Sequence, residues 1–230
     1  MLKHIPNTIT CCNLICGAIA VMYAFRADYS MAFTMIICGA VFDFFDGFAA
    51  RLLHVSSPVG KELDSLADVV TFGLAPAAIV YALLREQSGE ASFIPYAAFL
   101  IAAFSALRLA KFNLDTRQTD TFIGLPTPAN ALFWSALVLN ARHWLLNTPH
   151  AEWMMIAGVL LSCWCLLAEI PMLALKFKTY GWQGNALRYS FILLSALILI
   201  WLGWTGFWLV IVAYVLLSLA ANLTRAKKVA

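Results

Sequence analysis

The stretch FDFFDGFAAR, residues 42–51, places two aspartates inside an apolar run of the chain. Asp43 and Asp46 are three residues apart, so on a helix both carboxylates lie on one face. A charged carboxylate at the centre of a bilayer costs about 2.5 to 3.5 kcal/mol on insertion scales, and such residues usually mark functional sites. The groups that neutralise this pair therefore bear on both the fold and the function.

The composition around this stretch is that of a membrane protein. Of 230 residues, 63% are hydrophobic and 12% are charged, and the mean hydropathy is +0.83. Soluble domains average about 25% charged residues. We therefore expect a single all-α domain over residues 1–230, folded as a polytopic helical bundle in the membrane. The net charge of +3 is small and gives no reason to expect a nucleic-acid partner.

Each membrane crossing needs about 20 mainly apolar residues, so the breaks between apolar runs define the expected helices. The first run lacks a signal-peptide cleavage site and is expected to remain as the first span. Residues 189–224 carry no charge, and GWTG at 203–206 is the only turn signal there, so this region could form two spans or one. About eight helices are expected, at residues 8–26, 30–52, 62–84, 92–112, 125–146, 152–175, 184–203 and 206–223.

The cationic residues predict the orientation of these helices. With eight spans, Arg26, Arg85 and Arg142 fall on one side, and the other twelve of the fifteen Lys and Arg residues fall on the side of the N-terminus. Loops on the cytoplasmic side carry the excess of cations. This pattern predicts a multi-pass protein of the cytoplasmic membrane, with both termini and the 51–61 loop in the cytoplasm.

A second pair of aspartates follows that loop. Asp64 and Asp68 are spaced i, i+4, and the short loop makes their helix an antiparallel neighbour of the first, so all four carboxylates can converge. Left uncompensated, they would cost on the order of 10 kcal/mol. Hard divalent cations such as Mg²⁺ or Mn²⁺ favour all-oxygen sites, and four carboxylates can bridge two ions. A water-filled vestibule or a path for cation transport remains an alternative.

Residues 43–68 read D-x2-D-G-x2-A-R-x8-G-x3-D-x3-D. This pattern resembles the signature of the CDP-alcohol phosphotransferases, a family of integral membrane enzymes that build phospholipid head groups. Glycines in such a pattern allow a ligand or a backbone to approach closely. All eight fixed positions match: Asp43, Asp46, Gly47, Ala50, Arg51, Gly60, Asp64 and Asp68.

Four further stretches resemble one branch of that family, the CDP-diacylglycerol–serine O-phosphatidyltransferases. They are IPNTITCCNL at 5–14, ELDSLADVVTFGLAPA at 62–77, RLAKFN at 108–113 and FIGLPTP at 122–128. The resemblance implies transfer of the phosphatidyl group from CDP-diacylglycerol to the hydroxyl of L-serine, giving phosphatidylserine and CMP. Sister enzymes that use glycerol 3-phosphate or inositol phosphate, or an ether-lipid donor, remain alternatives, as does a non-enzymatic cation transporter.

The family resemblance also implies roles for individual residues, and a homodimer. Asp68 would be the general base. The residues that would contact CDP-diacylglycerol are Asn7, Thr10, Gly47, Arg51 and Ser57, although Asn7 could instead cap the first helix. The ligands of two Mg²⁺ or Mn²⁺ ions would be Asp43, Asp46, Asp64 and Asp68.

Three residues near the end of the fourth helix are candidates for binding the serine carboxylate or the lipid phosphate. They are Arg108, Lys111 and Asn113. The two cations among them could equally serve only to set the topology. GLPTP at 124–128 is expected to shape the beginning of the next helix through its prolines, and no catalytic role is assigned to it.

Overall fold

The computed structural model describes residues 4–55, 57–89, 91–115, 122–173, 181–182 and 185–229, with side chains described up to residue 223. The all-α class is confirmed. Two short strands, β1 (Phe122–Ile123) and β2 (Pro171–Met172), pair antiparallel. In chain order the helical elements are α1 (Ile5–Phe25), α2 (Tyr29–Leu52), α3 (Pro58–Asp68), the π-helical η2 (Val69–Leu74), α4 (Ala75–Ser88), the 3-10 turn η3 (Ile94–Phe99), α5 (Leu100–Leu114), α6 (Thr127–Asn147), α7 (Ala151–Leu167), α8 (Ala186–Leu202), the 3-10 turn η4 (Gly203–Gly206) and α9 (Phe207–Val229).

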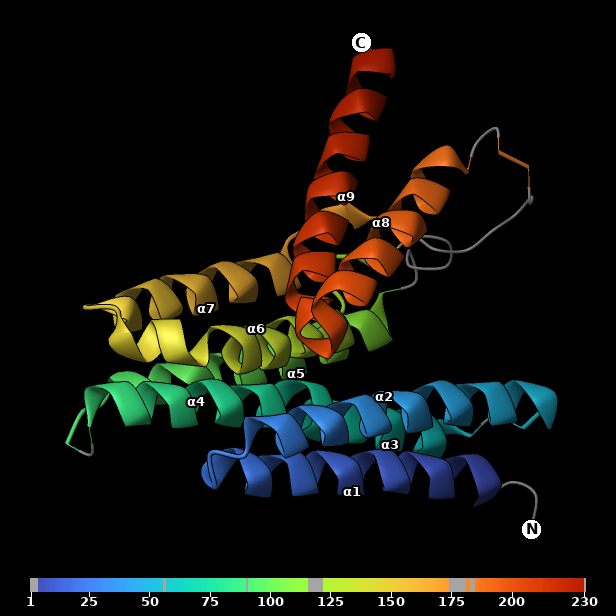
Figure 1. Ribbon diagram of the computed structural model, residues 1–230. Helices are drawn as coiled ribbons and strands as arrows, with labels where there is room; N and C mark the ends of the chain where they lie inside the picture. Colours follow the sequence, from blue (N-terminus) through green and yellow to red (C-terminus); the bar gives the residue numbers. More distant parts are fainter. Residues whose placement is uncertain are drawn as a thin grey trace.

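Helices α1 to α7 lie side by side, and the α8–α9 hairpin is set across them (Figure 1). The first turn of α1 and the α2–α3 connection lie at one end of the bundle, and the α1–α2, α4–η3 and α6–α7 connections lie toward the other. At that second end Arg142 Nη2 lies 2.6 Å from Glu86 Oε1. Of the twelve cations expected on the cytoplasmic side, Lys3, Arg117, Lys176 and Lys178 lie outside the described residues.

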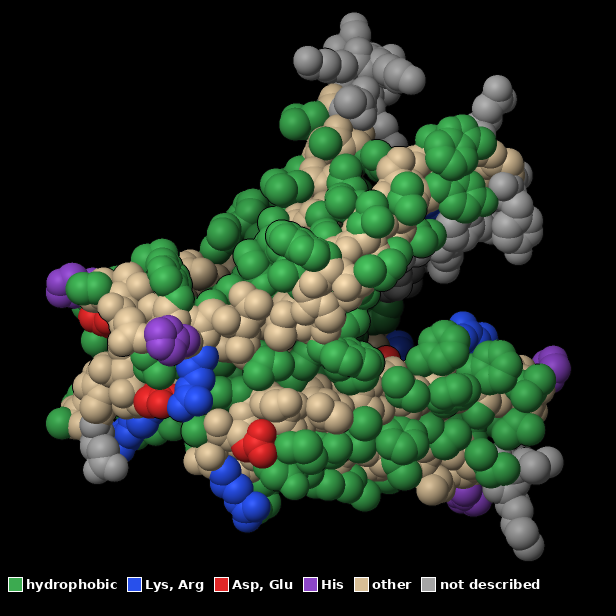
Figure 2. All heavy atoms as spheres, in the orientation of Figure 1, with side chains coloured by type: hydrophobic (Ala, Val, Ile, Leu, Met, Phe, Trp, Pro, Cys, Tyr) green, Lys and Arg blue, Asp and Glu red, His purple; other side chains and the backbone are tan. Residues whose placement is uncertain are grey.

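The outer surface of the bundle is apolar, as expected for a chain in lipid. Figure 2 shows hydrophobic side chains over most of the visible face, with charged side chains mainly toward the helix ends. Five stretches are long and apolar enough to cross a membrane, and α7 is a shorter apolar helix. The number of spans therefore stays a prediction. The five stretches are Ile5–Phe25, Tyr29–Leu52, Pro58–Ser88, Ile94–Leu114 and Ala186–Leu223.

The helix expected at 152–175 ends earlier than predicted. Helix α7 stops at Leu167, Pro171–Met172 forms β2, and residues 174–175 lie outside the described residues. The chain turns there because the backbone N–H of Gly124 donates to Ile170 O, which draws the segment after α7 onto the segment before α6. These contacts join residues far apart in sequence, so local hydropathy could not indicate them.

The stretch GLPTP begins α6 as expected. Pro126 is the N-cap residue of α6, with extended backbone, and a second proline occupies the first turn. Gly124 has φ +75°, and a Cβ there would lie 2.6 Å from Leu166 O, so both its conformation and the space around it require glycine. The expected turn at 203–206 is also present, as η4, and it separates α8 from α9.

One large core joins α1, α2 and η2 to α4, α6 and α7. Its fully buried members include Ile36 of α2, Phe72 of η2 and Trp134 of α6. The close approach of α1 and α2 to η2 depends on glycine, because a Cβ on Gly17 of α1 would overlap Thr71 and a Cβ on Gly39 of α2 would lie 2.5 Å from Thr71 Cγ2. The rigid packing of these elements fixes the spacing of the aspartates on α2 and α3.

A smaller core attaches the C-terminal hairpin to the bundle. Leu125, Met172, Phe191 and Val210 are buried in it together with Tyr214, whose hydroxyl donates to Leu173 O at 3.2 Å. All six cysteines are free.

Candidate active site

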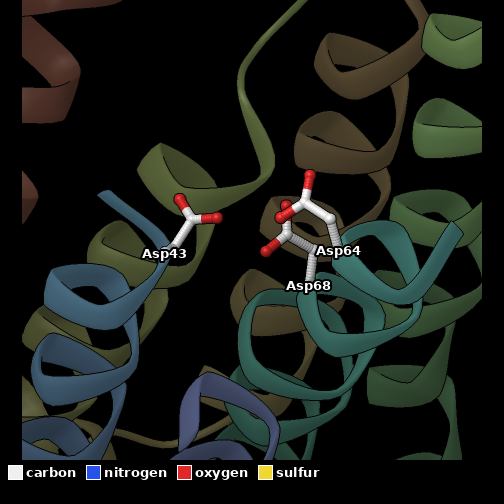
Figure 3. Close-up of side chains that lie close together, drawn as sticks. All are labelled: Asp43, Asp64 and Asp68. Carbon is white, nitrogen blue, oxygen red and sulfur yellow. The ribbon is translucent and has the colours of Figure 1, made fainter. Parts of the chain in front are cut away.

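Three aspartates from two helices meet at the centre of the candidate site. Asp43 lies on α2, and Asp64 and Asp68 lie on α3. One carboxylate oxygen from each residue lies within 4.8 Å of the corresponding oxygens of the other two (Figure 3). The predicted convergence of the two aspartate pairs is thus present for three of the four residues.

Local sequence features hold α3 in position for this contact. The Ser57 side chain caps the helix by accepting a hydrogen bond from Gly60 N at 2.9 Å, and Pro58 occupies the first turn. Asn13 of α1 donates from Nδ2 to Asp68 Oδ1 at 3.3 Å. The Thr71 hydroxyl donates in turn to Asn13 O at 3.0 Å, so α1 is fastened to α3 and η2 beside the site.

The fourth aspartate has a different neighbour. Asp46 is buried, and its Oδ2 accepts a hydrogen bond of 2.6 Å from the Thr10 hydroxyl on α1. It lies outside the group formed by the other three carboxylates. Its predicted role as a metal ligand therefore stays a prediction.

The donor set of the three grouped aspartates fits a hard divalent cation. Within the described residues, no lysine or arginine forms an ion pair with any of them. Asp68 is 8% exposed, and the other two are partly buried. Clustered carboxylates away from bulk water are strongly unfavourable unless a cation offsets their charge. Carboxylate oxygens are the ligands that Mg²⁺ and Mn²⁺ prefer.

A cavity of about 210 Å³ adjoins this group and contains most of the residues predicted to contact the nucleotide. Asp46 and Asp64 both line it, so it reaches the carboxylates. A Cβ on Gly47 would meet no atom within 4 Å, which leaves open space on that side of α2. The predicted residues in its wall are Asn7, Thr10, Gly47 and Ser57.

Asn7 and Arg51 were both predicted to contact the nucleotide, and they lie in different surroundings. The alternative role of Asn7 as a helix cap is wrong, because the N-cap residue of α1 is His4. Arg51 is exposed in the last turn of α2 and is not among the described residues that line the cavity. Its predicted contact with the CDP group stays a prediction.

The three acceptor candidates occupy different surroundings. Arg108 is buried, with its guanidinium carbon 5.7 Å from the centre of the Phe112 ring. Lys111 forms an exposed ion pair of 3.3 Å with Glu169. Asn113 donates to Ser65 Oγ at 2.8 Å. Arg108 also interacts electrostatically with Asp68.

Two residues of the site were given no role in the sequence analysis. Asn13 is fully buried against Asp68, and Lys61 lines the cavity while its Nζ donates to Asn113 O at 3.1 Å. An amide three residues after Thr10, on the same face of an apolar helix, was an available signal for Asn13. Lys61 was counted only toward the topology.

Comparison with known families gives one match. The family model described as CDP-alcohol phosphatidyltransferase matches residues 3–164. The matched range includes all four aspartates and extends through most of α7, so it contains the whole candidate site.

Several curated relatives carry the name CDP-diacylglycerol–serine O-phosphatidyltransferase, and three of them illustrate the range of similarity. The Helicobacter pylori J99 protein is 38% identical over 144 residues, which are 61% of this chain and 60% of the relative. The Bacillus subtilis protein is 39% identical over 55% of this chain and 71% of its own length. The Mycobacterium tuberculosis H37Rv protein is 28% identical over 93% of this chain and 76% of its own length. The match thus spans about 60% of the Helicobacter relative.

Proposed function

This chain belongs to the CDP-alcohol phosphatidyltransferase family, and from that premise we propose that it transfers the phosphatidyl group of CDP-diacylglycerol to L-serine. The products would be phosphatidylserine and CMP. The serine acceptor is supported by the names of the three relatives and by the branch-like stretches at residues 5–128. The whole chain would act as one membrane domain.

The observation that carries the proposal is the carboxylate group beside an open cavity. Asp64 belongs to both, since it lies in the group of three and lines the cavity with Gly47 and Lys61. If CDP-diacylglycerol bound with its nucleotide in the cavity, its diphosphate would lie next to the carboxylate group and could contact the cations held there. A transport path would instead favour acidic residues distributed along several helices.

The ligands of the metal would be Asp43, Asp64 and Asp68, with Asp46 completing a site for two ions. Bound to these oxygens, Mg²⁺ or Mn²⁺ would neutralise the diphosphate and stabilise the charge that develops on CMP as it leaves. Thr10 would orient Asp46 through its 2.6 Å hydrogen bond. Asn7 and Ser57 would contact the CDP group from the wall of the cavity, with Arg51 near its phosphates.

In the proposed reaction the serine hydroxyl oxygen forms a bond to the phosphorus that carries the diacylglycerol. The bond from that phosphorus to CMP breaks, and the hydroxyl proton passes to Asp68. The hydrogen bond from Asn13 to Asp68 Oδ1 holds the carboxylate in one orientation and leaves Oδ2 to accept the proton. General-base assistance of this kind contributes about 100- to 10,000-fold in rate.

A lipid donor needs lateral access to the site. Figure 2 shows a hollow between α8 and the C-terminal half of α2, with acidic and basic side chains visible at its inner end. The stacked rings of Phe44 and Phe48 are exposed on α2 beside Asp43. We propose that acyl chains approach over these rings, with the site and both termini in the cytoplasm, and that the enzyme is a homodimer.

An acceptor panel tests the function. Purified protein with CDP-diacylglycerol, Mn²⁺ or Mg²⁺, and labelled alcohols should release CMP with L-serine and form phosphatidylserine. A preference for glycerol 3-phosphate or inositol phosphate would contradict the serine assignment. Metal flux into proteoliposomes without CMP release would support a transporter and contradict the transferase proposal.

A further inference from the structure

The first turn of α6 contains two buried polar side chains without partners. Thr127 and Asn130 are each 0% exposed. Among the described residues, neither the Thr127 hydroxyl nor either polar atom of the Asn130 amide has a hydrogen-bond partner. A buried polar group left unpaired is destabilising, so each such group needs an explanation, and a bound ligand is one.

These side chains lie at the level of the carboxylate group. Ala131 and Trp134 lie four residues after Thr127 and Asn130, respectively, on the same face of α6. Both pack in the same core as Phe72 of η2. Thr127 and Asn130 lie nearer the α6 N-terminus, toward Asp68, which directly precedes η2. Figure 3 shows the chain beginning α6 behind the three carboxylates, and α6 packs against both α2 and η2.

Arg108 reaches the same level from α5. Ser105, one turn before it, faces η2, since a Cβ on Gly73 would lie 3.1 Å from Ser105 Cβ. Helix α5 runs antiparallel to the α3–η2 segment (Figure 1). Arg108, one turn after Ser105, therefore lies beside Asp68, which precedes η2, and the two side chains interact electrostatically. Arg108 is 7% exposed, and its Nε has no hydrogen-bond partner within the described part of the chain.

We propose that Thr127 and Asn130 act with Arg108 to bind the carboxylate of the amino-acid acceptor. All three side chains offer N–H or O–H donors, and the N-terminus of α6 adds its partial positive charge. The carboxylate would be held on the α5–α6 side of Asp68, with the acceptor hydroxyl directed toward the metal site. This site would select serine over alcohols that lack a carboxylate, and the inference rests on the proposed function.

The test uses two substitutions that keep side-chain size. Asn130→Asp replaces the amide donor with a carboxylate oxygen, and Thr127→Val removes the hydroxyl. We expect the KM for L-serine to rise about tenfold or more in each, which corresponds to about 1.4 kcal/mol of lost binding. The KM for CDP-diacylglycerol should stay within about twofold, since the nucleotide cavity is lined by other residues. The preference for L-serine over ethanolamine should fall in both variants.

Ser135→Ala is the matched control. Ser135 is also fully buried on α6 with an unpartnered hydroxyl among the described residues, about two turns beyond Thr127, so its loss should leave the KM for serine unchanged. An unchanged serine KM in Thr127→Val would overturn the inference, even if Asn130→Asp does not fold. An equal rise in the KM of both substrates would also overturn it. Wild-type protein that prefers another alcohol would instead contradict the proposed function.

Discussion

Asp68 is the residue on which the proposed chemistry depends most. It is the most buried of the three grouped carboxylates, and it contacts Asn13 of α1 while lying within reach of Arg108. A side chain with such neighbours is held in one position, as a general base requires. Its isosteric amide would keep the shape of the site and lose the ability to accept the proton.

Asp68→Asn should lower kcat by about 100-fold or more and leave CDP-diacylglycerol binding nearly unchanged. Turnover by radiolabelled serine incorporation and equilibrium nucleotide binding would be measured on the same preparation. Glu62→Gln is the matched control, because Glu62 is an exposed acid on the same helix and lies outside the carboxylate group. Retained turnover in Asp68→Asn would remove this residue as the base.

At the scale of single elements, α2 has two glycines with different surroundings. Gly39 packs against Thr71, with a Cβ position 2.5 Å from Thr71 Cγ2, whereas a Cβ on Gly47 would meet nothing within 4 Å. The first glycine permits α2 and η2 to approach, and the second leaves space in the nucleotide cavity. The same residue type therefore serves stability at one position and, in our proposal, substrate binding at the other.

Substituting alanine at each position should separate these effects. Gly39→Ala should destabilise the fold by about 1 to 3 kcal/mol, because the added methyl group overpacks a buried contact. Gly47→Ala should keep or raise the melting temperature, since alanine favours a helix over glycine by about 0.5 to 1 kcal/mol. It should also raise the KM for CDP-diacylglycerol. A lower melting temperature in Gly47→Ala with an unchanged KM would contradict the assignment.

At the scale of the whole molecule, the carboxylate group couples metal binding to stability. Asp43 on α2 and Asp64 and Asp68 on α3 repel one another across the helix pair. Cations bound between them would hold α2 and α3 together. Helix α2 belongs to the large core with α4, α6 and α7, and α3 continues directly into η2, which is also part of that core. The folded protein alone brings these carboxylates together, so binding should favour folding.

Removing divalent metal with a chelator should therefore abolish turnover and lower the melting temperature. Ions at 100 times their Kd would stabilise the fold by about 2.7 kcal/mol. Mn²⁺ or Mg²⁺ should restore both properties, and potassium at equal ionic strength should restore neither. Asp64→Asn should show a much smaller metal-dependent shift, and a shift equal to that of the wild type would count against the assigned ligands.

The sequence by itself determined the all-α membrane class, the family and the convergence of aspartates from α2 and α3. Those properties follow from composition, hydropathy and the spacing of eight fixed residues in 43–68, all of which are local along the chain. The expected close packing of α2 against α3 is wrong, because α1 packs extensively against both of them and they make few contacts with each other.

The expected helix ranges agree with the structure to within a few residues except at two ends. Helix α7 stops at Leu167, earlier than expected, and α9 continues to Val229, past the expected end at residue 223. The turn after α7 depends on hydrogen bonds from Gly124 and Leu125, which are some 40 residues away.

Only the tertiary structure decided which polar groups share the site. Packing separates Asp46 from the other three carboxylates through its bond to Thr10, and it brings Asn13 to Asp68 across 55 positions of sequence. Packing also places Thr127 and Asn130, to which the sequence analysis assigned no binding role, in the buried face of α6 that meets η2. Long-range packing selects one rotation of each helix, and no local pattern contains that information.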